Sequence, residues 1–121
     1  MSLRDEIIED LKTIEKDMEE PSFTWHGNPY VFIPSISEFQ RQLDTGGFQI
    51  VKLLTATVRK YDINWENDEK TYIPIFPNGT PQAQQIINYT LDGTNYRIEI
   101  VKHDPVNASM RIIAHSTVKG L

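Results

Sequence analysis

The sequence contains no cysteine, little basic charge and no long apolar run. Without cysteine there are no disulfides, no thiol nucleophile and no thiolate metal site. A membrane-spanning helix needs about 20 mostly apolar residues, and no stretch approaches that length. With 12 Lys and Arg against 17 Asp and Glu, the chain has no basic stripe that would bind nucleic-acid phosphates. We therefore expect a cytoplasmic protein without a membrane partner.

Catalytic, metal-binding and cofactor-binding motifs are missing too. The three histidines, His26, His103 and His115, lie far apart, and no nucleophile elbow, phosphate-binding glycine loop or EF-hand spacing is present. The pair His103-Asp104 comes nearest to an acid–base dyad, but a turn histidine beside an aspartate is common. The acidic segment 62–69 lacks the glycine that a calcium loop needs. We expect no enzyme activity, no metal and no cofactor.

The negative charge is concentrated at the N-terminus. Residues 1–20 contain eight acids and three bases, a net charge of −5, which equals that of the whole chain. The remaining nine acids and nine bases cancel in residues 21–121. The sequence therefore predicts an acidic element followed by a neutral body, and 121 residues suffice for one compact unit.

An amphipathic helix is predicted over residues 1–20. Ser2 can cap its first turn, and Pro21 cannot continue it. Its apolar residues recur at spacings of three and four, which places them on one stripe. Two interpretations of the stripe stay open: it packs on its own domain, or it is an interface with a neighbouring subunit. The stripe consists of Leu3, Ile7, Leu11, Ile14 and Met18.

After Pro21, short extended runs alternate with turn residues. This texture predicts a mainly β (α+β) fold, a small antiparallel β-barrel or sandwich over residues 21–121 preceded by the one α-helix. Segment 48–61 is apolar on both faces for half its length, with Val51 and Leu53 on the second face, which is typical of a central strand. The other predicted strands cover residues 23–25, 30–33, 85–91, 95–101 and 110–118.

Three segments are not predicted as regular strands. Residues 35–45 are expected to be irregular or a short helical turn, and residues 72–77 at most an edge strand or an extended connector because of their two prolines. Residues 62–71 are expected to form an exposed, charged loop. Within that loop, Trp65 is a candidate interface anchor, with folding back onto the domain as the alternative.

An ordered series of short motifs runs through the body. Residues 23–35 read F-T-W-H-G-N-P-Y-V-F-I-P-S, residues 46–48 read G-G-F and residues 56–60 read A-T-V-R-K. They are followed by P-N-G at residues 77–79 and Y-R-I at residues 96–98. In order and type, this series resembles the small head–tail joining (tail attachment or stopper) proteins of long-tailed phages and prophages.

The resemblance implies a non-enzymatic structural protein of a virion. Such a protein is expected to be a small β-barrel that forms a homo-oligomeric ring between portal and tail. Its partners would be other head, portal and tail proteins, and DNA would pass through the ring without specific binding. It would be found in the host cytoplasm and in the virion. The charged segment 62–76 and the acidic helix depart from the pattern.

Two other functions stay open from the sequence. An OB-like nucleic-acid-binding module would use the scattered aromatic residues to stack on bases, although the body carries no excess of positive charge. A small-ligand-binding barrel would need an apolar pocket with a few convergent polar groups.

Overall fold

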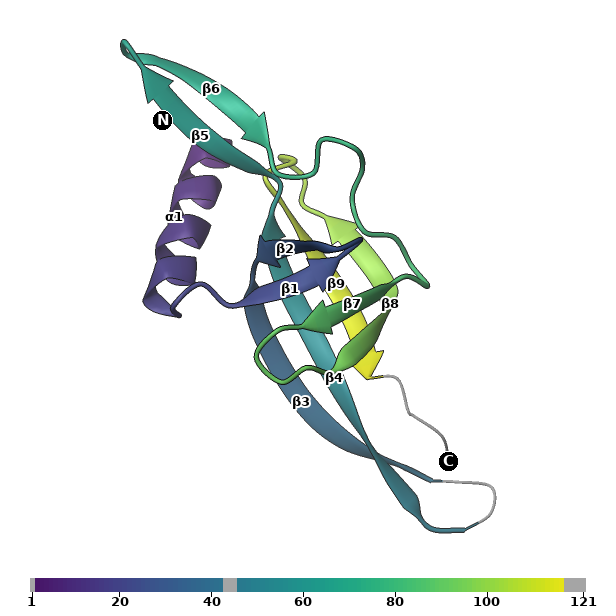
Figure 1. Cartoon of the computed structure of the whole chain (residues 1–121). Coiled ribbons are helices and arrows are strands. Elements are labelled where there is room, and N and C mark those ends of the chain that lie inside the picture. The colour runs from purple at the N-terminus through teal and green to yellow at the C-terminus, as the bar shows by residue number, and fades with distance from the viewer. Residues whose placement is uncertain (1, 43–45, 117–121) are drawn as a thin grey trace.

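The computed structural model describes residues 2–42 and 46–116, which form one helix followed by nine strands. Along the chain, the helix comes first, then a short hairpin of two strands (β1 and β2), and then a pair of long strands (β3 and β4), as Figure 1 shows. The elements are α1 (Leu3–Asp17), β1 (Ser22–Trp25), β2 (Asn28–Val31), β3 (Ile33–Gln42), β4 (Phe48–Arg59), β5 (Tyr61–Glu66), β6 (Glu69–Pro74), β7 (Ile86–Tyr89), β8 (Asn95–His103) and β9 (Ser109–Ser116).

The helix begins and ends where its capping residues require. The Oγ of Ser2 accepts a hydrogen bond from the backbone N–H of Asp5 at 3.2 Å, as predicted. Beyond Asp17, Glu19 and Glu20 take positive φ angles of 63° and 53°, so the helix cannot continue through them.

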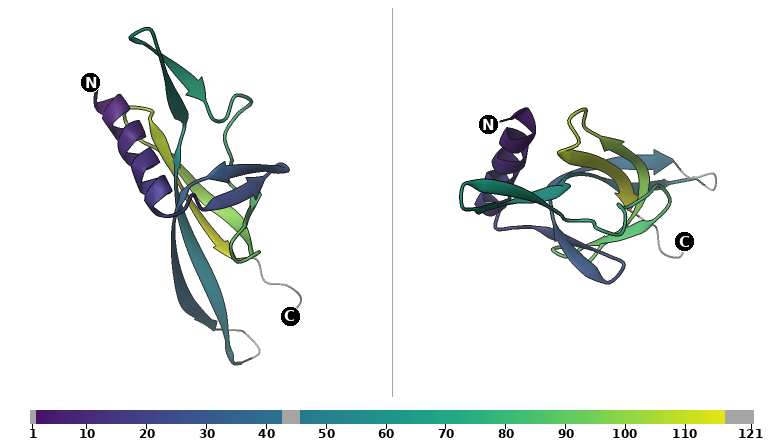
Figure 2. Two further views of the ribbon diagram at one scale, coloured as in Figure 1. Left: turned by 60° about the vertical axis from the view of Figure 1, so that its left-hand side comes forward. Right: turned by 90° about the horizontal axis from the view of Figure 1, so that it is seen from above.

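Seven strands form one antiparallel sheet that curls into a half-barrel. The strand order is β2-β1-β7-β8-β9-β4-β3, so β2 and β3 are its two edges. Only Phe32 separates these edge strands in the sequence, and the chain therefore brings both edges together at that residue. The view from above shows the resulting curl (Figure 2). The predicted mainly β fold with one N-terminal helix is confirmed.

The concave face of the sheet holds the core. Strand alternation turns Leu54, Ala56 and Val58 of β4 inward, beside Ile112 and Ala114 of β9. Phe23, Phe32 and Tyr89 pack edge to face nearby, with centroid separations of 5.1 and 5.3 Å. No helix in the described part of the chain is long and apolar enough to cross a membrane.

Strand β3 corrects the prediction for residues 35–45. Residues 33–42 pair with β4 in unbroken register, from Ile33 opposite Thr57 to Gln42 opposite Phe48. Serine, glutamate and glutamine give this segment low intrinsic strand propensity, but pairing with the long apolar strand outweighs it. Residues 43–45 lie outside the described part.

The loop predicted over residues 62–71 is also corrected, because it forms a two-stranded ribbon. Strand β5 pairs with β6 from Tyr61 opposite Pro74 to Glu66 opposite Glu69. Asn67 and Asp68 make the turn with φ angles of 51° and 64°. Asparagine and aspartate tolerate this left-handed geometry, which two-residue hairpin turns require. The segment is exposed as predicted, but it is paired.

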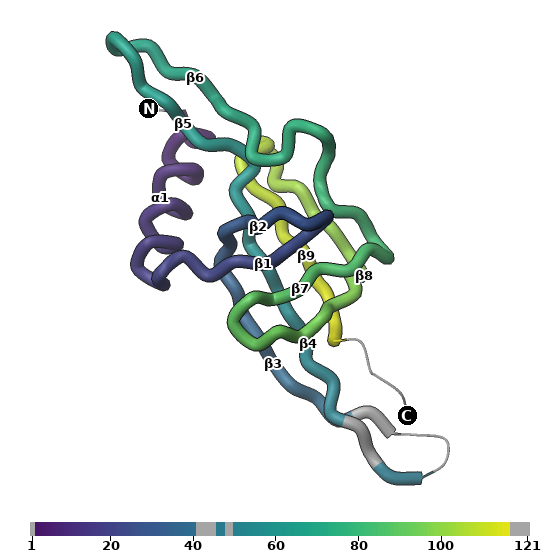
Figure 3. Tube along the Cα trace, viewed as in Figure 1, coloured from purple at the N-terminus to yellow at the C-terminus, as the bar shows by residue number. Residues whose placement is uncertain are grey.

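Two hairpins project from the half-barrel at opposite ends. The β5–β6 ribbon extends beyond the barrel next to the start of α1, and the far ends of β3 and β4 extend the other way (Figure 3). Both carry exposed apolar side chains: Trp65 and Ile73 on the ribbon, and Ile36, Phe39 and Ile50 on the β3–β4 arm.

The turn between β8 and β9 is organised by one carboxylate. Asp104 accepts hydrogen bonds from the backbone N–H groups of Val106, Ala108 and Ser109 and from the Ser109 hydroxyl, the last at 2.7 Å. Burial opposes the charge of this carboxylate, but the hydrogen bonds from Ser109 and the backbone outweigh burial and lower its pKa. The side chain is therefore occupied by the turn and does not form a dyad with His103.

Replacing Asp104 with alanine is expected to lower the free energy of unfolding by about 2–3 kcal/mol, because several partly buried N–H groups lose a charged acceptor. Urea denaturation at neutral pH measures the change. Asp10→Ala is the matched control, since that exposed carboxylate makes no ion pair with a described residue, and its effect should stay within about 0.5 kcal/mol. Equal effects of the two substitutions would contradict this role.

Candidate assembly surface

Helix α1 is held on the body by a charged face. Its buried residues are Asp5, Ile8 and Glu15, of which only one is apolar. Glu15 forms a bidentate ion pair with Arg59 of β4, with N–O distances of 2.7 and 3.0 Å. Burial of the guanidinium opposes its charge, but the hydrogen bonds and charge of Glu15 outweigh burial and raise the pKa of Arg59. This geometry fixes the second half of the helix on the convex face of the sheet, which we call the outer face.

The first turn of α1 is anchored on the β5–β6 ribbon. Lys70 and Tyr72 both donate hydrogen bonds to the carboxylate of Asp5. Those two bonds, that of Lys70 first, lower the pKa of Asp5 to about 2, against the opposing effect of burial. The guanidinium of Arg4 lies 4.6 Å from the ring centroids of both Tyr61 and Tyr72, a cation–π contact on two aromatic faces.

This anchoring leaves the predicted apolar stripe largely uncovered. Leu3, Ile14 and Met18 are 59%, 43% and 41% exposed, while Ile7 and Leu11 are half-buried. At 3.6 residues per turn, the centre of the stripe lies roughly 100° around the helix from the buried face. The helix is thus attached by its ion-pairing side and presents its apolar side to the surroundings.

Trp65 lies near the tip of the ribbon and is 53% exposed. Strand alternation puts it on the same face of β5 as Tyr61 and Ile63. That face is turned toward α1, because Tyr61 contacts Arg4. The structure therefore brings Trp65 to the side of the ribbon that faces the helix, away from the barrel core.

A groove on the outer face was not anticipated as a site. Its volume is about 340 Å³, and it is lined by Phe39, Val51, Leu53, Glu99 and His115. The sequence carried a signal for it, since Val51 and Leu53 make the second face of β4 apolar. A β-bulge at Glu99 adds to the apolar surface, because it shifts the register of β8 so that Ile100 lies opposite Ile113 on the outer face.

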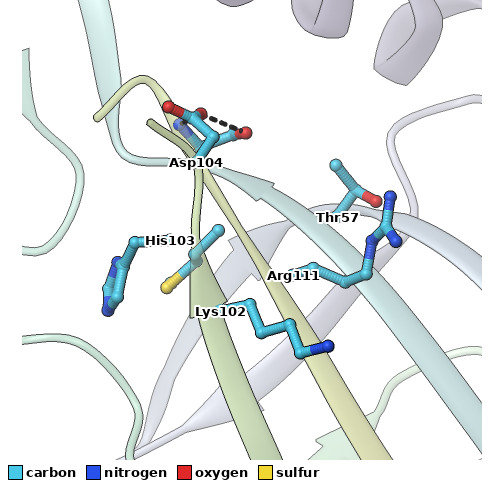
Figure 4. Close-up of a pocket in the computed structure, with 7 residues that line it drawn as sticks. Thr57, Lys102, His103, Asp104 and Arg111 are labelled. Carbon is cyan, nitrogen blue, oxygen red and sulfur yellow. Dashed lines mark hydrogen bonds between the residues drawn. The ribbon is translucent and has the colours of Figure 1, made fainter. Parts of the chain in front are cut away.

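Two cations lie side by side on the same outer face. Lys102 of β8 and Arg111 of β9 are directly opposite each other, and Arg111 is opposite Thr57 of β4. In Figure 4 these three side chains extend to one side of the sheet and His103 to the other. Neither cation forms an ion pair within the described residues. Like charges opposite each other destabilise a sheet, so this pair is better satisfied by an anion from outside.

A separate pocket of about 470 Å³ lies beside the β1–β2 turn. Its lining combines the rings of Trp25, Tyr30 and Phe76 with amide side chains. The indole N–H of Trp25 donates to Gln85 at 3.1 Å, and the ring stacks on His26 with centroids 4.1 Å apart. These rings are mostly committed to contacts within the chain. Within residues 2–42 and 46–116, no three His, Asp or Glu side chains gather to hold a metal ion.

The anchoring of Asp5 predicts an acid-sensitive step. Its pKa in the folded state, about 2, lies below the ordinary 3.8, so the unfolded chain binds the proton more readily. The stability that Asp5 contributes is complete above pH about 4 and is lost as the pH falls toward 2. In Asp5→Asn this part of the pH dependence of stability should disappear. Urea unfolding of both proteins between pH 2 and 5 gives the free energy of unfolding at each pH. Parallel curves of free energy against pH for the two proteins would contradict the role of Asp5.

Comparison of the chain with protein-family models, with curated proteins and with solved structures gave no match.

Proposed function

We propose that this chain is a non-enzymatic assembly subunit, a component of a phage or prophage head–tail connector that forms a ring between portal and tail. The assembly role is supported by the orientation of α1 on the body. Asp5 and Glu15 attach the helix, while Leu3, Ile14 and Met18 stay exposed. Apolar side chains in such a row are typical of protein–protein interfaces. The connector role itself depends on the ordered motifs of residues 23–98.

The two projecting hairpins support a ring. A ring is built from heterologous contacts, in which one surface of a subunit binds a different surface of the next. The β5–β6 ribbon and the β3–β4 arm extend from opposite ends of the half-barrel, and each presents exposed apolar side chains. A subunit with binding elements at both ends is suited to contact different neighbours above and below the ring.

The charge distribution suits a channel for DNA. A protein that binds phosphates through many Lys and Arg residues gains affinity from counterion release and would hold the DNA in place. This chain has a net charge of −5, and most of its excess acids lie on α1. A ring of such subunits would let DNA slide through without specific binding.

The test is to mix the purified protein with tail-less, DNA-filled heads and with free tails of the phage that encodes it. We expect it to bind at the portal vertex in negative-stain images, or to restore the joining of heads to tails. The control is heads that already carry tails, which should bind none. Absence of binding to either component would refute the connector role.

The pocket beside the β1–β2 turn favours a second candidate function, the binding of a small uncharged ligand. It combines aromatic rings with the amides of Asn28, Gln82 and Gln85, and its described lining contains no Asp, Glu, Lys or Arg, a composition that suits a neutral polar molecule. A panel of monosaccharides and nucleosides, tested by thermal shift, addresses this candidate. A rise in the melting temperature that Gln85→Ala abolishes would support ligand binding in this pocket. No change in melting temperature with any compound would exclude these compounds as ligands.

A further inference from the structure

The outer face of the sheet is covered only in part by the chain's own helix. The ion pair between Glu15 and Arg59 fixes α1 over the end of β4 that follows Val58. The groove lined by Phe39, Val51 and Leu53 lies toward the other end of the same strand. Phe39 is 47% exposed and Leu53 is half-buried, whereas Val51 is buried. Phe39 and Leu53 therefore stay open to another molecule.

The open part of the outer face is bordered by positive charge. Arg97, opposite His115, and Lys102, opposite Arg111, project from the same face as the groove. The one acid in the groove lining is Glu99, and it lies 3.6 Å from the Nδ1 of His115. None of Arg97, Lys102 and Arg111 forms an ion pair with a residue that the structure describes. An apolar groove flanked by such cations suits an amphipathic element whose apolar side is flanked by acids.

Helix α1 has that composition. Its stripe is bordered on the side away from the body by Glu6, Asp10 and Asp17, which lie within roughly a quarter turn of Leu3 and Ile14. All three acids are exposed, and none forms an ion pair with a described residue. The apolar stripe and its acidic border thus complement the groove and its basic border.

We infer that the stripe of α1 docks into the outer-face groove of a second copy of this chain. The stripe residues Leu3, Ile14 and Met18 cover Phe39, Leu53 and Ile113, and the acidic border faces Lys102 and Arg111. The inference rests on the proposed ring, for which it supplies the contact between subunits. Since the stripe and the groove are different surfaces, the contact is heterologous and repeats from copy to copy.

The combination of an apolar lining with a basic border selects a second copy over DNA as the occupant. Phosphates would satisfy Lys102 and Arg111 but would leave the apolar lining of the groove exposed. A copy of α1 satisfies both, and it also covers the exposed stripe. DNA binding is nevertheless a distinguishable outcome, because it would depend steeply on salt. It would be lost in Lys102→Glu/Arg111→Glu, whereas a substitution at Ile14 would leave it unchanged.

Cross-linking between two single-cysteine proteins tests the contact, and the absence of native cysteine makes the result unambiguous. One full-length protein carries Ile14→Cys and the other, with a distinguishing mass tag, carries Leu53→Cys. Mixed and oxidised at high concentration, they should form the mixed disulfide at least about tenfold more than the control, since the bond requires Cα atoms within about 7 Å. The control pair uses Thr13→Cys, which lies on another face of the helix.

The outcomes separate the contact from the proposed function. No excess of the mixed disulfide over the control overturns the inference; if heads and tails still join, the connector role stands without it. Formation of the disulfide supports the contact between copies, even if the protein binds neither heads nor tails and the connector role falls.

A charge exchange gives a second readout. The substitutions Lys102→Glu/Arg111→Glu are added to the Leu53→Cys protein. Its cross-linking to the Ile14→Cys protein, which keeps its native acids, should fall about tenfold, because two ion pairs become repulsive. Asp10→Lys/Asp17→Lys on the helix partner should restore it. Lack of restoration would overturn the assigned orientation of the helix in the groove.

Discussion

Aspartate in place of both Leu3 and Ile14 is expected to abolish assembly while leaving the isolated chain folded. Both side chains are exposed in the single subunit, so the free energy of unfolding should change by no more than about 0.5 kcal/mol for each. In an assembly they would lie in an apolar contact, where loss of a central residue costs 2 kcal/mol or more and weakens association by more than tenfold. Urea denaturation measures the first effect, and head–tail joining the second.

The matched control adds more negative charge to another face of the same helix. Thr13→Asp/Lys16→Asp changes exposed residues outside the stripe, and assembly should persist in that variant. Equal loss of joining in both variants would mean that charge, and not the apolar stripe, governs the result. If the variant with aspartate at positions 3 and 14 still joined heads to tails fully, the apolar stripe of α1 would take no part in assembly.

Replacing Arg59 with methionine is expected to cost about 3 kcal/mol or more, because the buried carboxylate of Glu15 loses its partner. The second half of α1 should detach while Asp5 still holds the first turn on the ribbon. Limited proteolysis between residues 17 and 22 reports this loosening, and urea unfolding gives the free energy. Lys12→Met is the control, since the Lys12–Asp62 pair has side chains about 40% exposed and such pairs contribute under about 1 kcal/mol.

The double variant Glu15→Leu/Arg59→Met separates the cost of an unpaired charge from the cost of a lost contact. With both charges gone, a leucine against a methionine should recover most of the stability, because a buried ion pair is often no stronger than apolar packing of similar volume. If the double variant is as unstable as Arg59→Met alone, the ion pair itself attaches the helix.

Much of the fold was predictable because local signals agreed with the tertiary structure. The capping by Ser2, the turn at His26-Gly27 that joins β1 to β2, and the turn around Asp92-Gly93 that joins β7 to β8 all depend on residues a few positions apart. The strand β3 was missed because its stabilising partner is distant: residues 35–42 have weak propensity and gain their order from β4. The ribbon was missed because Asn67-Asp68, a competent two-residue turn, lies among charges typical of a loop.

The candidate site was predictable in its residues but not in its geometry. Periodicity identified the stripe from Leu3 to Met18, and the usual inference is that such a stripe is the face a helix buries. Here the buried face is set by ion pairs to Arg59 and Lys70, which lie 44 and 65 residues away. Sequence spacing cannot reveal partners at that separation, so the orientation of the helix required the structure.

The most direct test of the central claim, that the stripe of α1 is covered in the assembly, is the oxidation rate of Met18. Met18 is 41% exposed in the single subunit, whereas Met110 is buried and serves as an internal control. With dilute peroxide followed by peptide mass spectrometry, Met18 should form sulfoxide readily in the free protein. In protein bound at the head vertex, we expect its oxidation to slow to the rate of Met110. Oxidation of bound Met18 at the free rate would contradict the account.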